Sequence, residues 1–406
     1  MLIGLYLTCL LACVKQQIKH DLHLTRHQFW NLAASSWFVS SPAFGIDHED
    51  IRIPLEAGGG GTLAIRLRLY SQTKNKFQIV RAIVDTGSPY LVFTNDNTRV
   101  SSSQAFITSQ NMLSIWSALL FQFESETAPR WFGKSQYRPT EEVYGTIKGY
   151  VDWKSAYVDI PRAQNLQFSS RLIVGLLDYN LTEESGGPLF GLIRYINPSA
   201  SPIKYQPRPT VLGQFLPLNI RSFCLDAPNR MLTLSTRNLI QSATKNTINL
   251  VDLRPLGDFV DHYAVLVHSF VVDRNPDWTY RGGTKLVSWQ QDQHGKRPVV
   301  AVFDTGLTGC VITRALWDEL QSQSSWPSPS EYKYIQLRFK NNSADEESFI
   351  ESGKDSVSFY VAPIDLDWFD NDENSPHVVV LGQAFLGRGV LIIDTVRRYA
   401  TFSIKS

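Results

Sequence analysis

The sequence contains one tight turn twice, and this repeat constrains the fold more than any other feature. Asp85-Thr86-Gly87 and Asp304-Thr305-Gly306 lie 219 positions apart (304 − 85), each directly after an apolar run. Each copy predicts a β-strand that ends in a turn whose glycine adopts backbone angles that other residues resist. An apolar strand with a glycine follows each copy, at residues 171–176 with Gly175 and at residues 378–382 with Gly382. We interpret the pattern as an internal duplication of one unit.

The composition favours a mainly β globular protein. A chain of 406 residues can build two sizeable cores, and its net charge of +1 without a long basic run argues against nucleic-acid binding. Charged residues make up 19% and aromatic residues 12%, which fits a β-rich globular protein better than a disordered or coiled-coil chain. Short runs rich in Val, Ile, Tyr and Phe between Gly, Pro and Asn predict strands, among them residues 62–69, 77–84 and 262–272. Residues 275–297 are polar and predict a surface loop.

The paired Asp-Thr-Gly turns, each followed by its glycine-bearing strand, resemble those of the pepsin-like aspartic proteases over residues 51–406. The resemblance implies a bilobal fold of two pseudo-twofold related β-barrel-like lobes, residues 51–220 and 221–406, with the active site between them. Residues 142–149 resemble the β-hairpin flap whose tyrosine, here Tyr144, closes over the substrate. An ordinary hairpin tyrosine is the alternative. Residues 222–225 resemble the Cys-bearing strand that links the lobes in nepenthesin-like members.

Two carboxyl groups held together explain how such a site cuts a peptide. They cannot both ionise cheaply, so they share one proton, and the pair serves as both base and acid toward a water and the scissile carbonyl. We expect Asp85 and Asp304 to be catalytic, with a peptide or protein substrate, no metal and no cofactor, in a monomer. The resemblance implies that Thr86 and Thr305 cross-link the two turns. It also gives the full set of substrate-binding or supporting positions: Thr86, Gly87, Ser88, Tyr144, Gly145, Thr146, Thr305, Gly306 and Thr308.

Two residues depart from the family pattern. Val92 stands where many relatives have a tryptophan beside the flap tyrosine, and Leu307 stands where a hydroxyl residue usually hydrogen-bonds the second aspartate. Losing such a bond to a charged group costs about 1.5–3 kcal/mol, which predicts a raised pKa for the pair and a pH optimum shifted upward. These departures keep open a pepsin-fold protein that binds without cutting. A carbohydrate- or lipid-binding β protein with coincidental turns is the third reading, and the duplication argues against it.

The N-terminal region predicts targeting and processing. Residues 1–14 are apolar and fit a signal peptide, although a lipoprotein cleavage box at residues 10–13 is an alternative. Residues 15–50 are locally basic, which fits either the pro-segment of a zymogen or a solvated N-terminal arm. We expect a protein that is secreted or lies in an endomembrane or vacuolar lumen, with no membrane span after signal removal. Asn180 and Asn341 fit the glycosylation pattern. Cys224 and Cys310 are either two isolated thiols or one disulfide.

Overall fold

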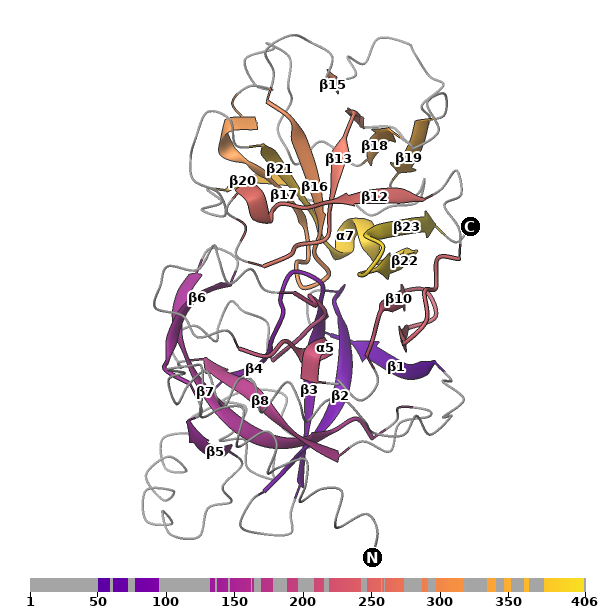
Figure 1. Ribbon diagram of the computed structural model, residues 1–406. Helices are drawn as coiled ribbons and strands as arrows, with labels where there is room; N and C mark the ends of the chain where they lie inside the picture. Colours follow the sequence, from indigo (N-terminus) through magenta and orange to yellow (C-terminus); the bar gives the residue numbers. More distant parts are fainter. Residues whose placement is uncertain are drawn as a thin grey trace, which may run out of the picture. The chain divides into compact units, whose positions relative to one another are not determined.

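The computed structural model describes a mainly β chain within the compact unit that begins at Glu49 (Figure 1). The described residues are 50–58, 61–71, 77–94, 132–135, 137–144, 147–161, 163, 169–177, 188–195, 208–214, 219–241, 247–256, 258, 260–273, 287–290, 297–316, 318, 334–340, 347–351, 361–364 and 376–404. Within these ranges no helix has the length and apolar character needed to cross a membrane. The predicted signal peptide (1–14) and all of the predicted pro-segment (15–50) except Asp50 lie outside them.

The first half of the described chain is built from strands and one short helix. Its strands are β1 (Ile51–Ala57), β2 (Leu63–Tyr70), β3 (Phe77–Asp85), β4 (Leu91–Thr94), β5 (Phe132–Ser135), β6 (Thr140–Tyr144), β7 (Ile147–Asp159), β8 (Ser169–Leu177) and β9 (Leu189–Gly191), and its helix is α5 (Val211–Gln214). Six of these strands pair in a closed ring, β2–β3–β9–β4–β8–β7–β2, which is a β-barrel. The ring buries Leu67, Val84, Phe93 and Phe190 in its core.

The second half repeats the local topology of the first. It contains β10 (Ser222–Asp226), β11 (Met231–Ser235), β12 (Ile248–Val251), the 3₁₀ helix η4 (Arg254–Leu256), β13 (Ala264–Val267), β14 (Ser269–Asp273), β15 (Val287–Gln290), β16 (Val299–Phe303), β17 (Cys310–Thr313), β18 (Tyr334–Lys340), β19 (Glu347–Glu351), β20 (Val361–Ile364), β21 (His377–Leu381), α7 (Gln383–Leu386), β22 (Gly389–Asp394) and β23 (Tyr399–Ile404). β3 runs parallel to β9, and β4 returns antiparallel to the same strand. β16 and β17 pair with β21 in the same two ways.

This repeated topology corrects the predicted correspondence between the two glycine-bearing strands. The partner of residues 378–382 is β9, which ends at Gly191, because both strands lie between the two arms of an Asp-Thr-Gly turn. Gly175 lies on β8, which runs parallel to β4 as β20 runs parallel to β17. The prediction was wrong because β9 has only three residues, whereas β8 is a long apolar strand that dominates the sequence pattern.

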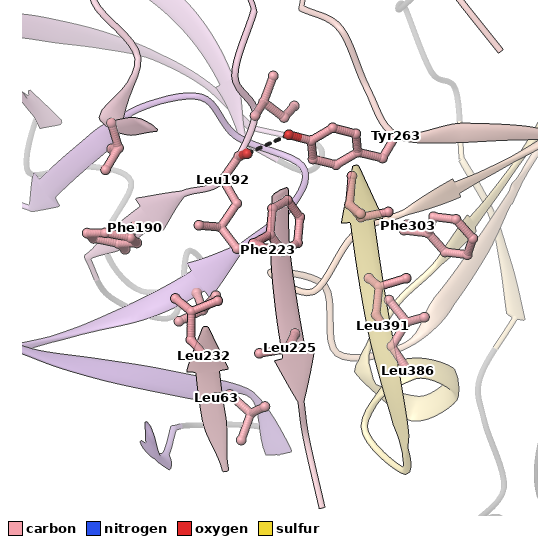
Figure 2. Packing of buried hydrophobic residues seen from close by; sticks show 14 of the residues in the cluster. Leu63, Phe190, Leu192, Phe223, Leu225, Leu232, Tyr263, Phe303, Leu386 and Leu391 are labelled. Atoms are coloured by element: carbon pink, nitrogen blue, oxygen red, sulfur yellow. Dashed lines mark hydrogen bonds between the residues drawn. The ribbon is translucent and has the colours of Figure 1, made fainter. Parts of the chain in front are cut away.

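A six-stranded antiparallel sheet, β1–β11–β10–β22–β23–β12, joins the two halves. Figure 2 shows its buried side chains, among them Phe223 and Leu225 of β10 and Leu391 of β22. The ring of Phe223 packs against that of Tyr263 with 5.5 Å between centroids, and the Tyr263 hydroxyl donates a 2.7 Å hydrogen bond to the Leu192 carbonyl (Figure 2). These contacts tie the segment after β9 to the segment that enters β13.

Several element predictions are confirmed and two are wrong. Residues 62–69 and 77–84 form β2 and β3, and residues 142–149 form a hairpin in which Tyr144 pairs with Ile147. The single strand predicted at residues 262–272 is two strands, because β13 pairs with β16 while β14 pairs with β15 and β18. The loop predicted at residues 275–297 contains β15. The composition of this polar segment does not predict a strand, and the strand forms because the segment hydrogen-bonds to β14.

Candidate active site

The two Asp-Thr-Gly turns are held by matching backbone contacts. Asp85 is the last residue of β3, and its carbonyl accepts a 2.7 Å hydrogen bond from Leu192 N. Asp304 follows β16, and its N–H donates to the Leu381 carbonyl at 3.0 Å. In both halves a parallel neighbour, β9 or β21, therefore fixes the strand that delivers the aspartate.

Thr86 and Thr305 cross-link the two turns, as the resemblance implies. Thr86 N donates to Thr305 Oγ1 at 3.1 Å, and Thr305 N donates to Thr86 Oγ1 at 2.9 Å. Each hydroxyl donates in turn to a carbonyl of the opposite strand, Thr86 to Phe303 at 2.8 Å and Thr305 to Val84 at 2.7 Å. Both threonines are fully buried. Four buried hydrogen bonds between segments 219 residues apart therefore set the spacing of the two aspartates.

Each carboxyl group lies against the glycine of the opposite turn. A Cβ atom on Gly87 would stand 2.7 Å from both Cγ and Oδ2 of Asp304, and one on Gly306 would stand 2.6 Å from Cγ and Oδ1 of Asp85. Within its own turn, Asp85 Oδ1 accepts from Gly87 N at 2.7 Å, and Asp304 Oδ1 accepts from Gly306 N at 2.9 Å. Only glycine leaves room for this arrangement, which explains why the tripeptide occurs in both halves.

The electrostatics of the two carboxyl groups differ. Burial, followed by the charge of Asp304, raises the pKa of Asp85 well above its ordinary value, against the lowering effect of the Gly87 N–H. Burial also raises the pKa of Asp304, but a hydrogen bond with Asp85 and the positive charge of His262 counteract it, as do the N–H groups of Gly306 and Leu307. Because the two carboxyl groups are coupled, they titrate as a pair that holds one proton at intermediate pH, and the positive charge of His262 acts on Asp304.

The other predicted positions surround this pair to different degrees. Ser88 is buried and its hydroxyl accepts from Tyr90 N at 3.3 Å. Thr308 is exposed, and its carbonyl accepts from Ala384 N at 2.8 Å. Tyr144 ends β6 at the tip of the hairpin, but its side chain is outside the described part of the structure, as are Gly145 and Thr146.

Leu307, the residue without a hydroxyl, packs its side chain against an apolar cluster of the second half. The cluster consists of Leu253, Ala264, Val300, Val302, Val378 and Val380. The backbone of Leu307 joins the second Asp-Thr-Gly turn to the start of α7. Its N–H donates to the Asp304 carbonyl at 3.3 Å, and its carbonyl accepts from Gln383 N at 2.7 Å. Burial is the largest cause of the raised pKa of both carboxyl groups, and the Leu307 N–H lowers that of Asp304, so the effect of the missing hydroxyl stays a prediction.

An indole lies beside Val92, although it comes from β7 and not from position 92, where the resemblance places it. Trp153 of β7 and Val92 approach the same point above Gly175, each 3.3 Å from the position of a Cβ there. The Trp153 indole N–H donates to Thr140 Oγ1 at 2.8 Å. The guanidinium of Arg208, also buried, lies 4.5 Å from the indole centre. The sequence analysis missed Trp153 and Arg208, because no motif marks them.

The sequence analysis also missed a second pair of side chains, His262 and Asp258. They lie next to Asp85 and Asp304, the two carboxyl groups called the dyad below. Both side chains are buried, and His262 Nδ1 stands 2.9 and 3.0 Å from the two carboxylate oxygens of Asp258. One signal was available: an Asp-x-x-x-His pair precedes a strand that is adjacent to the second turn.

Cys224 and Cys310 are not joined by a disulfide, which corrects one of the two predicted alternatives. Cys224 lies on β10 in the sheet that joins the halves, whereas Cys310 begins β17 and pairs with Val361 and Leu381. Burial raises the pKa of the Cys310 thiol to about 12. Asn180 and Asn341, the predicted glycosylation sites, lie outside the described residues.

Comparison with protein-family models and with curated proteins gave no match for this chain. Among the residues that the structure describes, no group of three or more His, Cys, Asp or Glu side chains is arranged to hold a metal ion.

Proposed function

We propose that this chain is an aspartic-type endopeptidase with a pepsin-like bilobal fold. The observation that carries the proposal is the pair of carboxyl groups from two matching turns, each lying against the glycine of the other turn. The duplicated pairing of β3, β4 and β9 with that of β16, β17 and β21 supports the pseudo-twofold relation of the two lobes.

The positive charge of His262, which acts on Asp304, supports different tasks for the two aspartates in the first step. Asp304, the ionised partner, takes a proton from a water held between the carboxyl groups, and that water attacks the carbonyl carbon of the scissile bond. Asp85, the protonated partner, donates a hydrogen bond to the carbonyl oxygen as negative charge develops there. A proton from the pair then reaches the leaving nitrogen, so the peptide bond breaks without a covalent enzyme intermediate.

The hairpin of β6 and β7 is proposed as the flap over an extended peptide substrate, with Tyr144 at its tip. The indole of Trp153, which donates to Thr140 on β6, holds the base of this hairpin against Val92 and so takes the place of an indole at position 92. Secretion, or residence in an endomembrane lumen, and activation by loss of residues 15–50 belong to the same proposal.

A cleavage assay tests the proposed activity. Chain lacking residues 1–48 is incubated with casein or haemoglobin between about pH 3 and 6, with and without pepstatin. We expect pepstatin-sensitive cleavage that disappears in Asp85→Asn and in Asp304→Asn. Asp226→Asn is the matched control, because Asp226 accepts from Asn229 N and Nδ2 at 3.2 and 2.9 Å at the turn between β10 and β11, and full activity is expected.

The alternative is a pepsin-fold protein that binds peptides without cutting them. One observation favours it: the side chain of Leu307 packs into an apolar cluster and offers Asp304 no hydroxyl. A folded wild-type chain that binds pepstatin but leaves the substrate intact at every pH would support this alternative over the protease.

A further inference from the structure

His262 lies across a β-ladder from Asp304. β13 and β16 are antiparallel with Ala264 opposite Val302, and the Tyr263 carbonyl accepts from Phe303 N at 3.0 Å, one residue beyond the assigned strand. The same register places His262 opposite Asp304. Opposed residues of an antiparallel pair direct their side chains to the same face, about 4.5–5.5 Å apart at Cβ. Ala264 and Val302, two positions away, both belong to the apolar cluster on that face.

Asp258 holds the imidazole in place. Its two carboxylate oxygens lie 2.9 and 3.0 Å from His262 Nδ1, and they also accept from the backbone N–H groups of Val260 and His262 at 3.3 Å each. Asp258 is 1% exposed and His262 8%. A buried carboxylate that binds both the ring and the backbone beside it fixes the orientation of the imidazole and favours its protonated form.

Within the described part of the chain, a third carboxylate near the ring has cation partners of its own. Asp261, the next carboxylate, is bound by Arg398 at 2.6 Å and lies 3.9 Å from Arg254. Asp258 and Asp304 then face the imidazole, and Asp85 lies beyond Asp304. Burial acts to lower the pKa of His262, but the charge and hydrogen bond of Asp258, and then the charges of Asp304 and Asp261, outweigh it and raise that pKa. The carboxylates around the ring therefore favour its protonated form.

We propose that His262, held by Asp258, is a positioning residue whose positive charge keeps Asp304 ionised, so that Asp85 carries the shared proton. The role rests on the proposed protease function and explains how the site works with Leu307 at a position where a hydroxyl would otherwise bind the aspartate. A buried cation within reach of the dyad stabilises its single negative charge in place of that hydrogen bond.

The pH dependence of cleavage tests this role. In His262→Gln, whose amide retains a hydrogen bond to Asp258 without the charge, both limbs of the kcat/KM profile are expected to move upward by about one pH unit. His268→Gln is the control: this histidine lies six residues later, between β13 and β14, and its profile is expected to match the wild type. A loss of activity with unchanged limbs would assign His262 a purely structural role and overturn the proposal.

A titration of the histidine rings separates this inference from the function on which it rests. The His262 signal is identified in ¹³C-histidine-labelled protein by its loss in His262→Gln, and its pKa is measured in the wild type and in Asp304→Asn. We expect the pKa to fall by about one unit in Asp304→Asn, whether or not the protein cleaves peptides. Equal values in the two proteins overturn the coupling. A fall in an inactive protein would retain the coupling and refute the protease function alone.

Discussion

The cross-link between the two turns predicts a large and specific loss of stability in Thr86→Val. Valine has the shape of threonine, but it removes the hydroxyl that accepts from Thr305 N at 2.9 Å and donates to the Phe303 carbonyl at 2.8 Å. The Thr305 N–H and the Phe303 carbonyl then lose the Thr86 hydroxyl as their partner in a fully buried place. Each costs about 1–3 kcal/mol, so we expect a decrease of about 2–4 kcal/mol in the free energy of unfolding, after some relaxation of the turn.

Urea unfolding followed by tryptophan fluorescence measures this decrease. Thr86→Ser is the matched control, because it keeps the hydroxyl and removes only a buried methyl group, at a cost of about 1 kcal/mol. Thr305→Val removes the equivalent pair of bonds, to Thr86 N and the Val84 carbonyl, and is expected to cost as much as Thr86→Val. Equal stability of Thr86→Val and Thr86→Ser would refute the cross-link as the element that joins the turns.

Three further predictions concern the dyad and the core. Gly306→Ala places a Cβ 2.6 Å from the Asp85 carboxyl and is expected to lower kcat/KM by about 100-fold. Gly61→Ala is the control: its φ of +83° strains the backbone, but no atom lies within 4 Å of the added Cβ, so kcat/KM is expected to stay unchanged. Folding raises the pKa of Asp85, so above about pH 4 the folded state binds more protons than the unfolded chain, and stability falls as pH rises through that range. In melting curves at a series of pH values, we expect Asp85→Asn to have a higher Tm than the wild type at about pH 7 and an equal Tm below about pH 4. Cys310, fully buried with a pKa of about 12, is expected to resist iodoacetamide in the folded protein and to react in urea, and mass spectrometry of the labelled peptide shows either result.

The sequence revealed the parts of the fold that repeat or alternate. The two Asp-Thr-Gly turns were visible because each half uses the same three residues, with the carboxylate accepting from the glycine N–H of its own turn. Gly191 was not recognised as the counterpart of Gly382, although each approaches the backbone of its turn so closely that a Cβ would collide with it. A three-residue strand carries too little hydrophobic pattern to be found from sequence alone.

The supporting residues of the site could not be predicted, because long-range pairing brings them there. The proposed approach of His262 to Asp304 follows from extending the register of β13 on β16 by two residues, which no local pattern encodes. Trp153 meets Val92 only because β4 and β7 both pair with β8 at Gly175. The absence of a Cys224–Cys310 disulfide likewise depends on which sheet each strand joins.

The most direct measurement of the central claim is a crystal structure of the chain bound to pepstatin, whose hydroxyl is expected at the place of the proposed attacking water. The account predicts that this oxygen lies within about 2.6–3.2 Å of a carboxylate oxygen of Asp85 and of Asp304 together. An inhibitor bound elsewhere, or a hydroxyl that contacts one carboxyl while the other points away from it, would contradict the account.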